Sequence, residues 1–234
     1  MANNTGLNPN CIFLVCLFLL TACGGGGRFE APNGNTPSQP TVPSTHSNRV
    51  VVSLYGDSLT VGAIAIKGLL DVPPTERLQE ILGEAFRVEL RGTSGAVARQ
   101  AVLGDFPRWL WAPFQQQIAL DGTNVAVIRF GGADAILGTE PEAFRKQLTM
   151  LAHQAKAAHP KVLIVGVIPS RTFVQGTALM DAINREVAKD QEVAYINLRD
   201  LDFDPVKDTA AGDAVHPSQA FSDRIVNKIS RYIQ

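Results

Sequence analysis

The sequence lacks the features that mark several large classes of protein. Its 234 residues carry a formal net charge of −1, so it has no basic excess of the kind that nucleic-acid-binding proteins use. It has three cysteines and four histidines, and none of them forms a cluster with the spacing of metal ligands. Phosphate-loop and dinucleotide motifs are also missing. We therefore expect no metal, no cofactor and no nucleic-acid partner.

The chain also lacks an apolar run long enough to cross a bilayer as a helix. Residues 11–20 are continuously apolar, but a spanning helix needs about 20 such residues. Ten residues suit the core of a signal peptide, although residues 1–10 lack the usual Lys or Arg. Leu20-Thr21-Ala22-Cys23 resembles the lipobox of bacterial lipoproteins, in which the cysteine is lipidated and becomes the first mature residue. The alternative is an apolar helix with an incidental cysteine.

The lipobox resemblance implies three segments. Residues 1–22 would be a signal peptide, residues 23–48 the lipidated Cys23 and a linker rich in Gly, Pro, Asn, Ser and Thr, and residues 49–234 a folded domain. As a flexible coil the linker would reach roughly 25–30 Å. Gly24 after the cysteine favours the outer over the inner membrane. We therefore expect a lipid-anchored protein of the bacterial envelope, with no thiol left for a disulfide or a metal.

The rest of the chain alternates short apolar runs with longer amphipathic stretches. The runs are rich in Val and Ile and do not alternate strictly with polar residues, which is typical of strands buried on both faces. They are Val50–Leu54, Val88–Leu90, Val125–Ile128, Val162–Ile168 and Val193–Leu198. Helical spacing places Phe144, Leu148, Leu151 and Ala155 on one face. Ser218 is a good N-cap for a final helix, in which Phe221, Ile225 and Ile229 are four apart. This order predicts an α/β fold with a doubly wound, five-stranded parallel sheet.

Ser58 is the first candidate for chemistry. It follows a buried strand in Gly56-Asp57-Ser58-Leu59, and α/β proteins bind their ligands at the carboxyl ends of strands. At the start of the next helix, free backbone N–H groups would favour a nearby anion. The other interpretation is a plain turn, because Gly, Asp and Ser are common turn residues.

Asp213 and His216 strengthen the catalytic interpretation. A serine hydroxyl becomes a good nucleophile when an imidazole removes its proton, and a carboxylate fixes the imidazole tautomer. Asp213 and His216 are three apart in Asp213-Ala214-Val215-His216-Pro217, so the carboxylate can reach Nδ1 and leave Nε2 for Ser58. His153 and His159 are expected to be exposed helix residues.

Together these motifs resemble those of the GDSL, or SGNH, hydrolase family across residues 50–234. The first block of the family is similar to Gly56–Leu59, the second to Gly92-Thr93-Ser94-Gly95 and the last to Asp213–Pro217. The resemblance implies a three-layer, flavodoxin-like fold and ester hydrolysis by Ser58, His216 and Asp213. It further implies an oxyanion hole formed by the amides of Ser58 and Gly95. The overall pattern is most similar to the lysophospholipase and arylesterase branch.

One block departs from the family pattern. Family members read Gly-x-Asn-Asp, and the Asn side chain donates to the oxyanion, whereas this chain has Ala133 at the Asn position, followed by Asp134. Losing one such donor typically costs about 10²–10³ in turnover. Reduced activity is therefore expected unless another side chain replaces it. Arg91 and Arg129 are close in sequence, but their direction cannot be predicted.

Two further features have competing interpretations. Gly92-Thr93-Ser94-Gly95-Ala96 is similar to the Gly-x-Ser-x-Gly elbow of α/β-hydrolases, which makes Ser94 a rival nucleophile with weaker support than Ser58. The aromatic cluster Phe106–Trp111 contains Trp109 and Trp111. These side chains could line the site or pack in the core.

The sequence thus predicts a serine esterase that acts on short-chain acyl or lysophospholipid-type esters and is tethered to the envelope. One alternative is a carbohydrate or peptidoglycan O-acetyl esterase. A second is a non-catalytic ligand-binding lipoprotein, for which Ala133 is the sole support. The expected partners are a small-molecule, lipid or glycan ester and a membrane, and the oligomeric state is left open.

Overall fold

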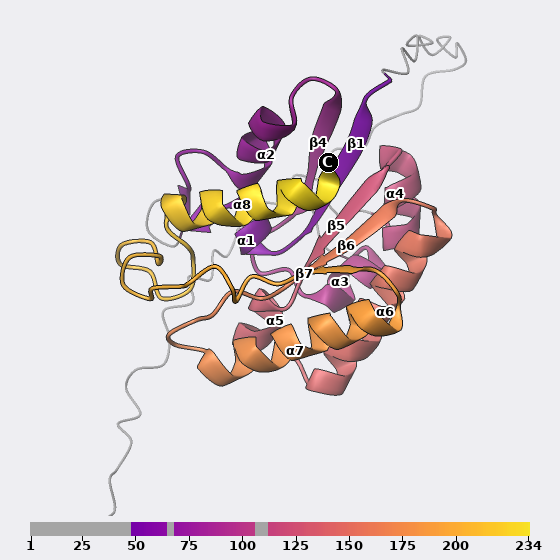
Figure 1. Cartoon of the computed structure of the whole chain (residues 1–234). Helices are drawn as coiled ribbons and strands as arrows, with labels where there is room; N and C mark the ends of the chain where they lie inside the picture. The colour runs from indigo at the N-terminus through magenta and orange to yellow at the C-terminus, as the bar shows by residue number, and fades with distance from the viewer. Residues whose placement is uncertain (1–47, 65–67, 106–111) are drawn as a thin grey trace, which may run out of the picture. The chain divides into compact units, whose positions relative to one another are not determined.

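A computed structural model describes residues 48–64, 68–105 and 112–234. Its main sheet has five parallel strands in the order β4-β1-β5-β6-β7 (Figure 1). They are β1 (Val50–Gly56), β4 (Phe86–Gly92), β5 (Val125–Arg129), β6 (Lys161–Val165) and β7 (Ala194–Ile196). Chain order along the sheet reverses at β1, which lies between β4 and β5. This is the doubly wound, flavodoxin-like arrangement, so the predicted fold class is confirmed.

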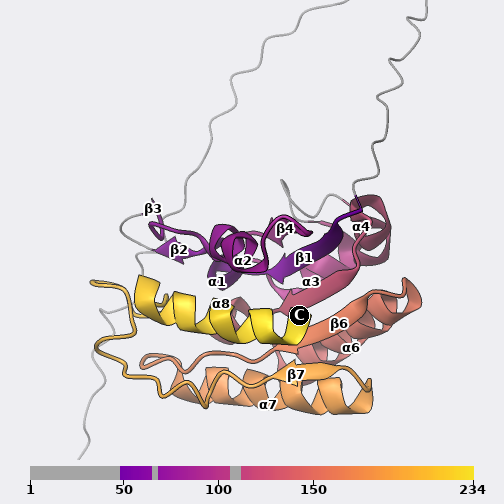
Figure 2. The same ribbon diagram turned by 45° about the horizontal axis from the view of Figure 1, so that its top comes forward.

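Helices cover both faces of the sheet, as the view in Figure 2 shows. One face is covered by α2 (Pro74–Leu82) and α8 (Gln219–Ile233), which also pack on each other. The other face is covered by α3 (Ala98–Leu103), α4 (Phe114–Asp121), α6 (Pro141–Ala157) and α7 (Val174–Asp190). Two short helices come shortly after strands: α1 (Ser58–Val61) follows β1, and α5 (Gly132–Leu137) follows β5. A small antiparallel pair of strands, β2 (Ala63–Ile64) and β3 (Gly68–Leu69), follows α1.

The strands divide their side chains between the two cores. In β5, Val125 and Val127 pack with α2 and α8, whereas Ala126 and Ile128 pack with the opposite helices. Successive residues of a strand point to opposite faces of the sheet. Because both faces of the sheet are buried, apolar residues follow one another along the strand and do not alternate with polar ones, as the sequence pattern indicated.

The predicted helix faces are also confirmed. Phe144, Leu148, Leu151 and Ala155 are completely buried. In α8, Phe221 and Ile225 are buried, and the Ser218 side chain accepts a hydrogen bond from the Phe221 amide as the N-cap. His153 and His159 are exposed, as expected, but only His153 is a helix residue, because α6 ends at Ala157 and His159 lies beyond it.

The predicted strand ending at Ile168 is too long, because β6 ends at Val165. Val167 and Ile168 are nevertheless buried. The amide of Val167 donates to Asp181 Oδ1 at 2.8 Å, so a side chain replaces a neighbouring strand as the acceptor. The apolar run continues past the end of β6 because the loop that follows the strand is itself buried. The β2–β3 hairpin was not predicted.

Several predictions concern residues outside the described ranges. They are the signal peptide, the lipidated Cys23, the linker up to residue 47, and Trp109 and Trp111. Among the helices that the structure describes, none is long and apolar enough to cross a membrane.

Candidate active site

The candidate site lies where the strand order reverses. Ser58 follows β1, Gly95 follows β4 and Ala133 follows β5, and these three strands are neighbours in the sheet. Parallel strands end at the same edge, so their following turns meet there. Ligands of doubly wound folds bind in the crevice at this point.

Gly56 lets the chain turn sharply into α1. A Cβ at this position would lie 2.1 Å from Thr60 Oγ1 and 2.4 Å from the carbonyl oxygen of Arg129, so a side chain is excluded. The carboxylate of Asp57 then accepts a 3.0 Å hydrogen bond from the Leu59 amide and caps the helix. As a result α1 begins at Ser58, whose side chain is half-buried rather than enclosed.

The loop before α8 holds Asp213 and His216 in a fixed relation. Asp213 Oδ1 accepts from the amides of Val215 at 2.8 Å and His216 at 3.1 Å. Its Oδ2 lies 2.8 Å from His216 Nδ1. The His216 carbonyl in turn accepts from the Ala210 amide at 2.9 Å, next to a β-bridge between Thr209 and Pro217. The imidazole is thereby oriented from both its ring and its backbone.

Ser58, His216 and Asp213 form one hydrogen-bonded chain. His216 Nε2 lies 3.0 Å from Ser58 Oγ, on the opposite side of the ring from Asp213. With the Nδ1 proton donated to the carboxylate, Nε2 accepts the hydroxyl proton of Ser58. The side chain of Asp213 is 3% exposed and that of His216 is 16% exposed. This arrangement is chemically able to activate a serine hydroxyl.

Two backbone amides are available to an oxyanion. Ser58 has the first N–H of α1, which no helical carbonyl can accept. Gly95 is exposed and has a φ of 78°, a left-handed conformation that glycine adopts easily. Neither amide donates to another described residue. The amide of Ala133, in contrast, donates to Asp57 Oδ2 at 2.9 Å.

The side chains considered as substitutes for the family Asn lie elsewhere. Arg91 pairs with Asp121 through two hydrogen bonds of 2.7 and 2.9 Å. Arg129 is buried and donates from Nη1 to the Leu59 carbonyl at 2.8 Å. No hydrogen bond of the described residues holds either guanidinium at the place where the amides of Ser58 and Gly95 would bind an oxyanion. Ser94, the rival nucleophile, is exposed and makes no hydrogen bond with His216.

Three ionisable groups are buried beneath the site: Asp57, Arg129 and Asp134. Burial raises the pKa of Asp57, whereas the Ala133 amide and the charge of Arg129 lower it. Burial, followed by the charge of Asp57, raises the pKa of Asp134 to about 7. Burial also lowers the pKa of Arg129 to about 10. Asp57 belongs to the sequence motif around Ser58. Its hydrogen bond with the Ala133 amide joins two loops that are far apart in the chain, so no local sequence pattern predicts it.

Arg171 is a second residue that sequence reasoning missed. It lies in the loop between β6 and α7 and donates from Nη2 to the Asp213 carbonyl at 3.0 Å. Arg171 and Asp213 are 42 residues apart in the sequence, and no sequence motif contains both. The loop before α8 is therefore supported from a neighbouring strand end.

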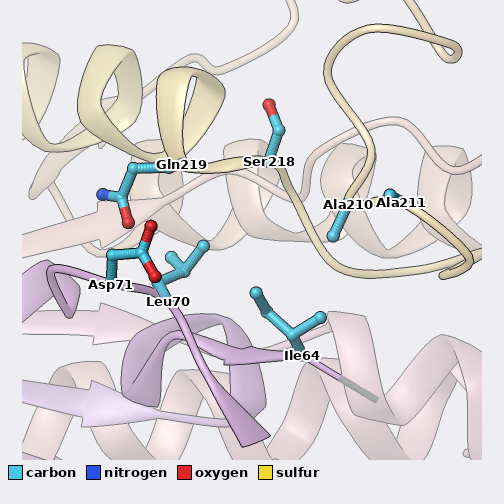
Figure 3. A pocket seen from close by; sticks show the side chains of 7 residues that line it. All are labelled: Ile64, Leu70, Asp71, Ala210, Ala211, Ser218 and Gln219. Atoms are coloured by element: carbon cyan, nitrogen blue, oxygen red, sulfur yellow. The ribbon is translucent and has the colours of Figure 1, made fainter. Parts of the chain in front are cut away.

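A small cavity flanks the segment that carries His216. Figure 3 shows it between the β2–β3 hairpin and the start of α8. Its volume is about 180 Å³, and it is lined by Ile64, Leu70, Asp71, Ala210, Ala211, Ser218 and Gln219. Gln219 is held in place by two hydrogen bonds of 3.1 and 3.0 Å to the backbone of Val72. Within the described residues, no group of three or more His, Cys, Asp and Glu side chains could hold a metal ion.

Comparison with known proteins agrees with this geometry. Residues 54–224 match the model of the GDSL-like lipase/acylhydrolase family. No curated protein matches the chain. A lipase/acylhydrolase from Enterococcus faecalis is similar in structure, with 18% identity and a TM-score of 0.64, covering 79% of this chain and 95% of that one.

Two named esterases are also similar in structure. The psychrotrophic esterase EstA from Pseudoalteromonas sp. has 16% identity and a TM-score of 0.61, covering 78% of this chain and 96% of its own. Axe2, an acetylxylan esterase from Geobacillus stearothermophilus, has 17% identity and a TM-score of 0.61, with coverage of 79% and 94%. At these identities the likeness shows a shared fold.

Proposed function

The chain belongs to the GDSL-like lipase/acylhydrolase family and is a carboxylic ester hydrolase, and on this premise we propose that Ser58, His216 and Asp213 are its catalytic triad. The observation that carries the proposal is the continuous chain of contacts, 3.0 Å from Ser58 Oγ to His216 Nε2 and 2.8 Å from Nδ1 to Asp213. In this assignment Ser58 is the nucleophile, His216 the general base and acid, and Asp213 the group that fixes the tautomer.

Ester cleavage then proceeds in two stages. Ser58 Oγ forms a bond to the carbonyl carbon while its proton passes to His216 Nε2, and the carbonyl electron pair moves onto oxygen. The amides of Ser58 and Gly95 hold this oxyanion. As it collapses, the bond to the alcohol oxygen breaks, and that oxygen takes the proton from His216. Water then forms a bond to the acyl carbon while one of its protons passes to His216 Nε2. The bond from the acyl carbon to Ser58 Oγ breaks, Oγ takes the proton back from His216, and the acid is released.

We propose short-chain esters of small alcohols as the substrate class. Because His216 must protonate the leaving oxygen, the alcohol portion lies on the His216 side of the acyl carbon. The cavity beside the Ala210–Gln219 segment is on the elements that carry His216, and its volume is about 180 Å³. Pockets for drug-sized ligands are about 300–1,000 Å³. A small alcohol fits this space better than a lysophospholipid headgroup with its glycerol.

A second candidate is an O-acetyl ester on a glycan. The exposed carboxylate of Asp71 lines the same cavity and could accept hydrogen bonds from sugar hydroxyl groups. The fold shared with an acetylxylan esterase is compatible with this substrate. A non-catalytic binding role has weaker support, because the Ser58–His216 contact is intact.

The nucleophile assignment is tested with a fluorophosphonate probe on purified residues 24–234, followed by peptide mapping. We expect the label on Ser58, and loss of both labelling and p-nitrophenyl acetate hydrolysis in Ser58→Ala. Ser94→Ala is the matched control and is expected to retain activity. Labelling of Ser94, or hydrolysis that survives Ser58→Ala unchanged, would refute the assignment. Acetate release from acetylated xylan without cleavage of longer acyl esters would select the glycan substrate.

We also propose that Cys23 is lipidated and tethers the enzyme to the bacterial envelope, on the outer rather than the inner membrane. The support is the Leu20–Cys23 sequence and the linker that follows it. Metabolic labelling with an alkyne fatty acid tests this proposal. Incorporation that persists in Cys23→Ser would contradict it.

A further inference from the structure

Arg129 has an unusual position for an arginine. It is the last residue of β5, paired with Gly56 of β1, and it is 6% exposed. Its Nη1 donates to the Leu59 carbonyl at 2.8 Å. Its Nε and Nη2 have no hydrogen-bond partner among the described residues. Burying a charge with incomplete hydrogen bonding is costly, so fold stability alone does not account for this residue.

Asp57, which lies in the field of Arg129, links two loops of the site. Its Oδ1 accepts from the Leu59 amide at 3.0 Å, and its Oδ2 accepts from the Ala133 amide at 2.9 Å. The first bond fixes the helix that begins with Ser58, and the second fixes the turn after β5. An ionised carboxylate accepts strongly on both oxygens, whereas in a protonated one the hydroxyl oxygen becomes a donor and a weaker acceptor. Both bonds are therefore strongest when Asp57 is charged.

The surroundings of Asp57 make its charge dependent on Arg129. Asp57 is 1% exposed, and burial favours its neutral form. Three titratable groups act on it: Arg129 from β5, His216 from the loop before α8, and Asp134 from α5. Asp134 disfavours a second negative charge, and His216 changes its charge during the reaction. Arg129 is therefore the one lasting positive charge among these three described groups.

We propose that Arg129 is a positioning residue for Ser58: its buried guanidinium holds the Leu59 carbonyl and keeps Asp57 ionised, so that the nucleophile helix and the Ala133 turn stay in register. The inference rests on the proposed role of Ser58. It assigns to Arg129 no contact with the substrate. Without Arg129, Asp57 takes up a proton at higher pH, one of its two amide bonds is weakened, and Ser58 shifts relative to His216 and Gly95.

The test compares Arg129→Met, which removes the charge, with Arg129→Lys, which retains it. A displacement of about 1 Å in a catalytic group can cost up to about 10²-fold in rate. We expect kcat for p-nitrophenyl acetate to fall about 10- to 100-fold in Arg129→Met, with KM little changed. We also expect an additional ionisation in its pH profile, absent from Arg129→Lys and from the double variant Arg129→Met, Asp57→Asn. Arg87→Met, a partly exposed arginine of β4, is the control and should behave like the parent protein.

A second readout does not depend on turnover. The ¹⁵N amide shifts of Leu59 and Ala133 should titrate together in Arg129→Met and stop doing so once Asp57 is also replaced. Coupled titration in a protein whose Ser58 does not react with the fluorophosphonate would refute the triad but support the positioning role. A folded Arg129→Met with parental kcat, pH profile and amide titration would overturn the inference. If Arg129→Met does not fold, Arg129→Gln is used in its place. Equal pH profiles of Arg129→Gln and Arg129→Lys would then overturn the inference.

Discussion

The backbone amide of Ala133 donates a 2.9 Å hydrogen bond to the Asp57 carboxylate. Ala133 stands where the family pattern has a donating Asn, and its methyl side chain cannot donate. The hydrogen bond to Asp57 means that the backbone of Ala133 does not supply the missing donor either. In the proposed mechanism the oxyanion is therefore held by the amides of Ser58 and Gly95.

Restoring the side-chain donor should raise activity. We expect Ala133→Asn to increase kcat for p-nitrophenyl acetate by about tenfold or more, because removing one such donor from other hydrolases costs about 10²–10³. Steady-state kinetics measure the change. Leu137→Asn, at an exposed position of the same helix, is the control. A folded Ala133→Asn protein with the parental kcat would show that another group already fills this role.

Removing the Asp213 charge should nearly abolish turnover without unfolding the loop. In Asp213→Asn the amide group favours the His216 tautomer with its proton on Nε2, which cannot accept from Ser58. A loss of about 10³–10⁴-fold in kcat is expected by analogy with other triads. Asp208→Asn is the matched control, since Asp208 is buried in the same loop and pairs with Arg224. It should lower stability but leave kcat nearly unchanged, and an equal loss of kcat in both variants would contradict the assignment.

Asp134 should make the protein less stable as the pH rises. Its pKa is raised from an ordinary 3.8 to about 7 by burial and by the charge of Asp57, so the folded state binds more protons than the unfolded state between these values. The free energy of unfolding therefore falls from about pH 4 to about pH 7, by up to about 4 kcal/mol. Asp134→Asn should remove this decline.

Urea unfolding at pH 4.5 and pH 8 measures the effect of Asp134. The parental protein should lose stability between the two values relative to Asp134→Asn. Asp202→Asn, at an exposed position, should follow the parental protein. A decline that is the same in all three proteins would exclude Asp134 as its source.

Filling the cavity near His216 should change selectivity for the alcohol. Ile64 lines the cavity opposite Ala210 and Ala211 (Figure 3), so Ile64→Trp should exclude larger alcohols. We expect kcat/KM to fall about 10-fold or more for glycerol triacetate relative to methyl acetate, since each methylene-sized misfit changes binding by about 1–3 kcal/mol. Leu69→Trp, an exposed position on the same hairpin, should leave the ratio unchanged. An unchanged ratio in Ile64→Trp would place the alcohol elsewhere.

The α/β class and the helix faces could be predicted because they depend on local patterns. Runs of Val and Ile marked all five strands, and the spacing from Phe144 to Ala155 marked one face of α6. The end of β6 was placed too late, because Val167 is buried although it lies in a loop and not in a strand. Periodicity reports burial, and burial does not distinguish these two cases.

The candidate site divides in the same way. Asp213 and His216 are three apart, so their pairing follows from the turn between them, and Ser58 was marked by the Gly-Asp-Ser-Leu string. The roles of Arg129 and Arg171 could not be predicted, because their partners are 70 and 42 residues away in the chain. No local pattern fixes which of several polar groups such a side chain meets.

By itself, then, the sequence determined the strands, the amphipathic helices, the family motifs and the missing donor at Ala133. Each of these depends on residues close together in the chain, where backbone geometry limits the outcomes. Tertiary structure alone decided that Ser58 lies 3.0 Å from His216, that Asp57 takes the Ala133 amide, and that the buried Arg129 donates to the Leu59 carbonyl. The last two relations arise where β1 and β5 become neighbours in the sheet. The first arises because the loop between β7 and α8 brings His216 back to the carboxyl end of β1.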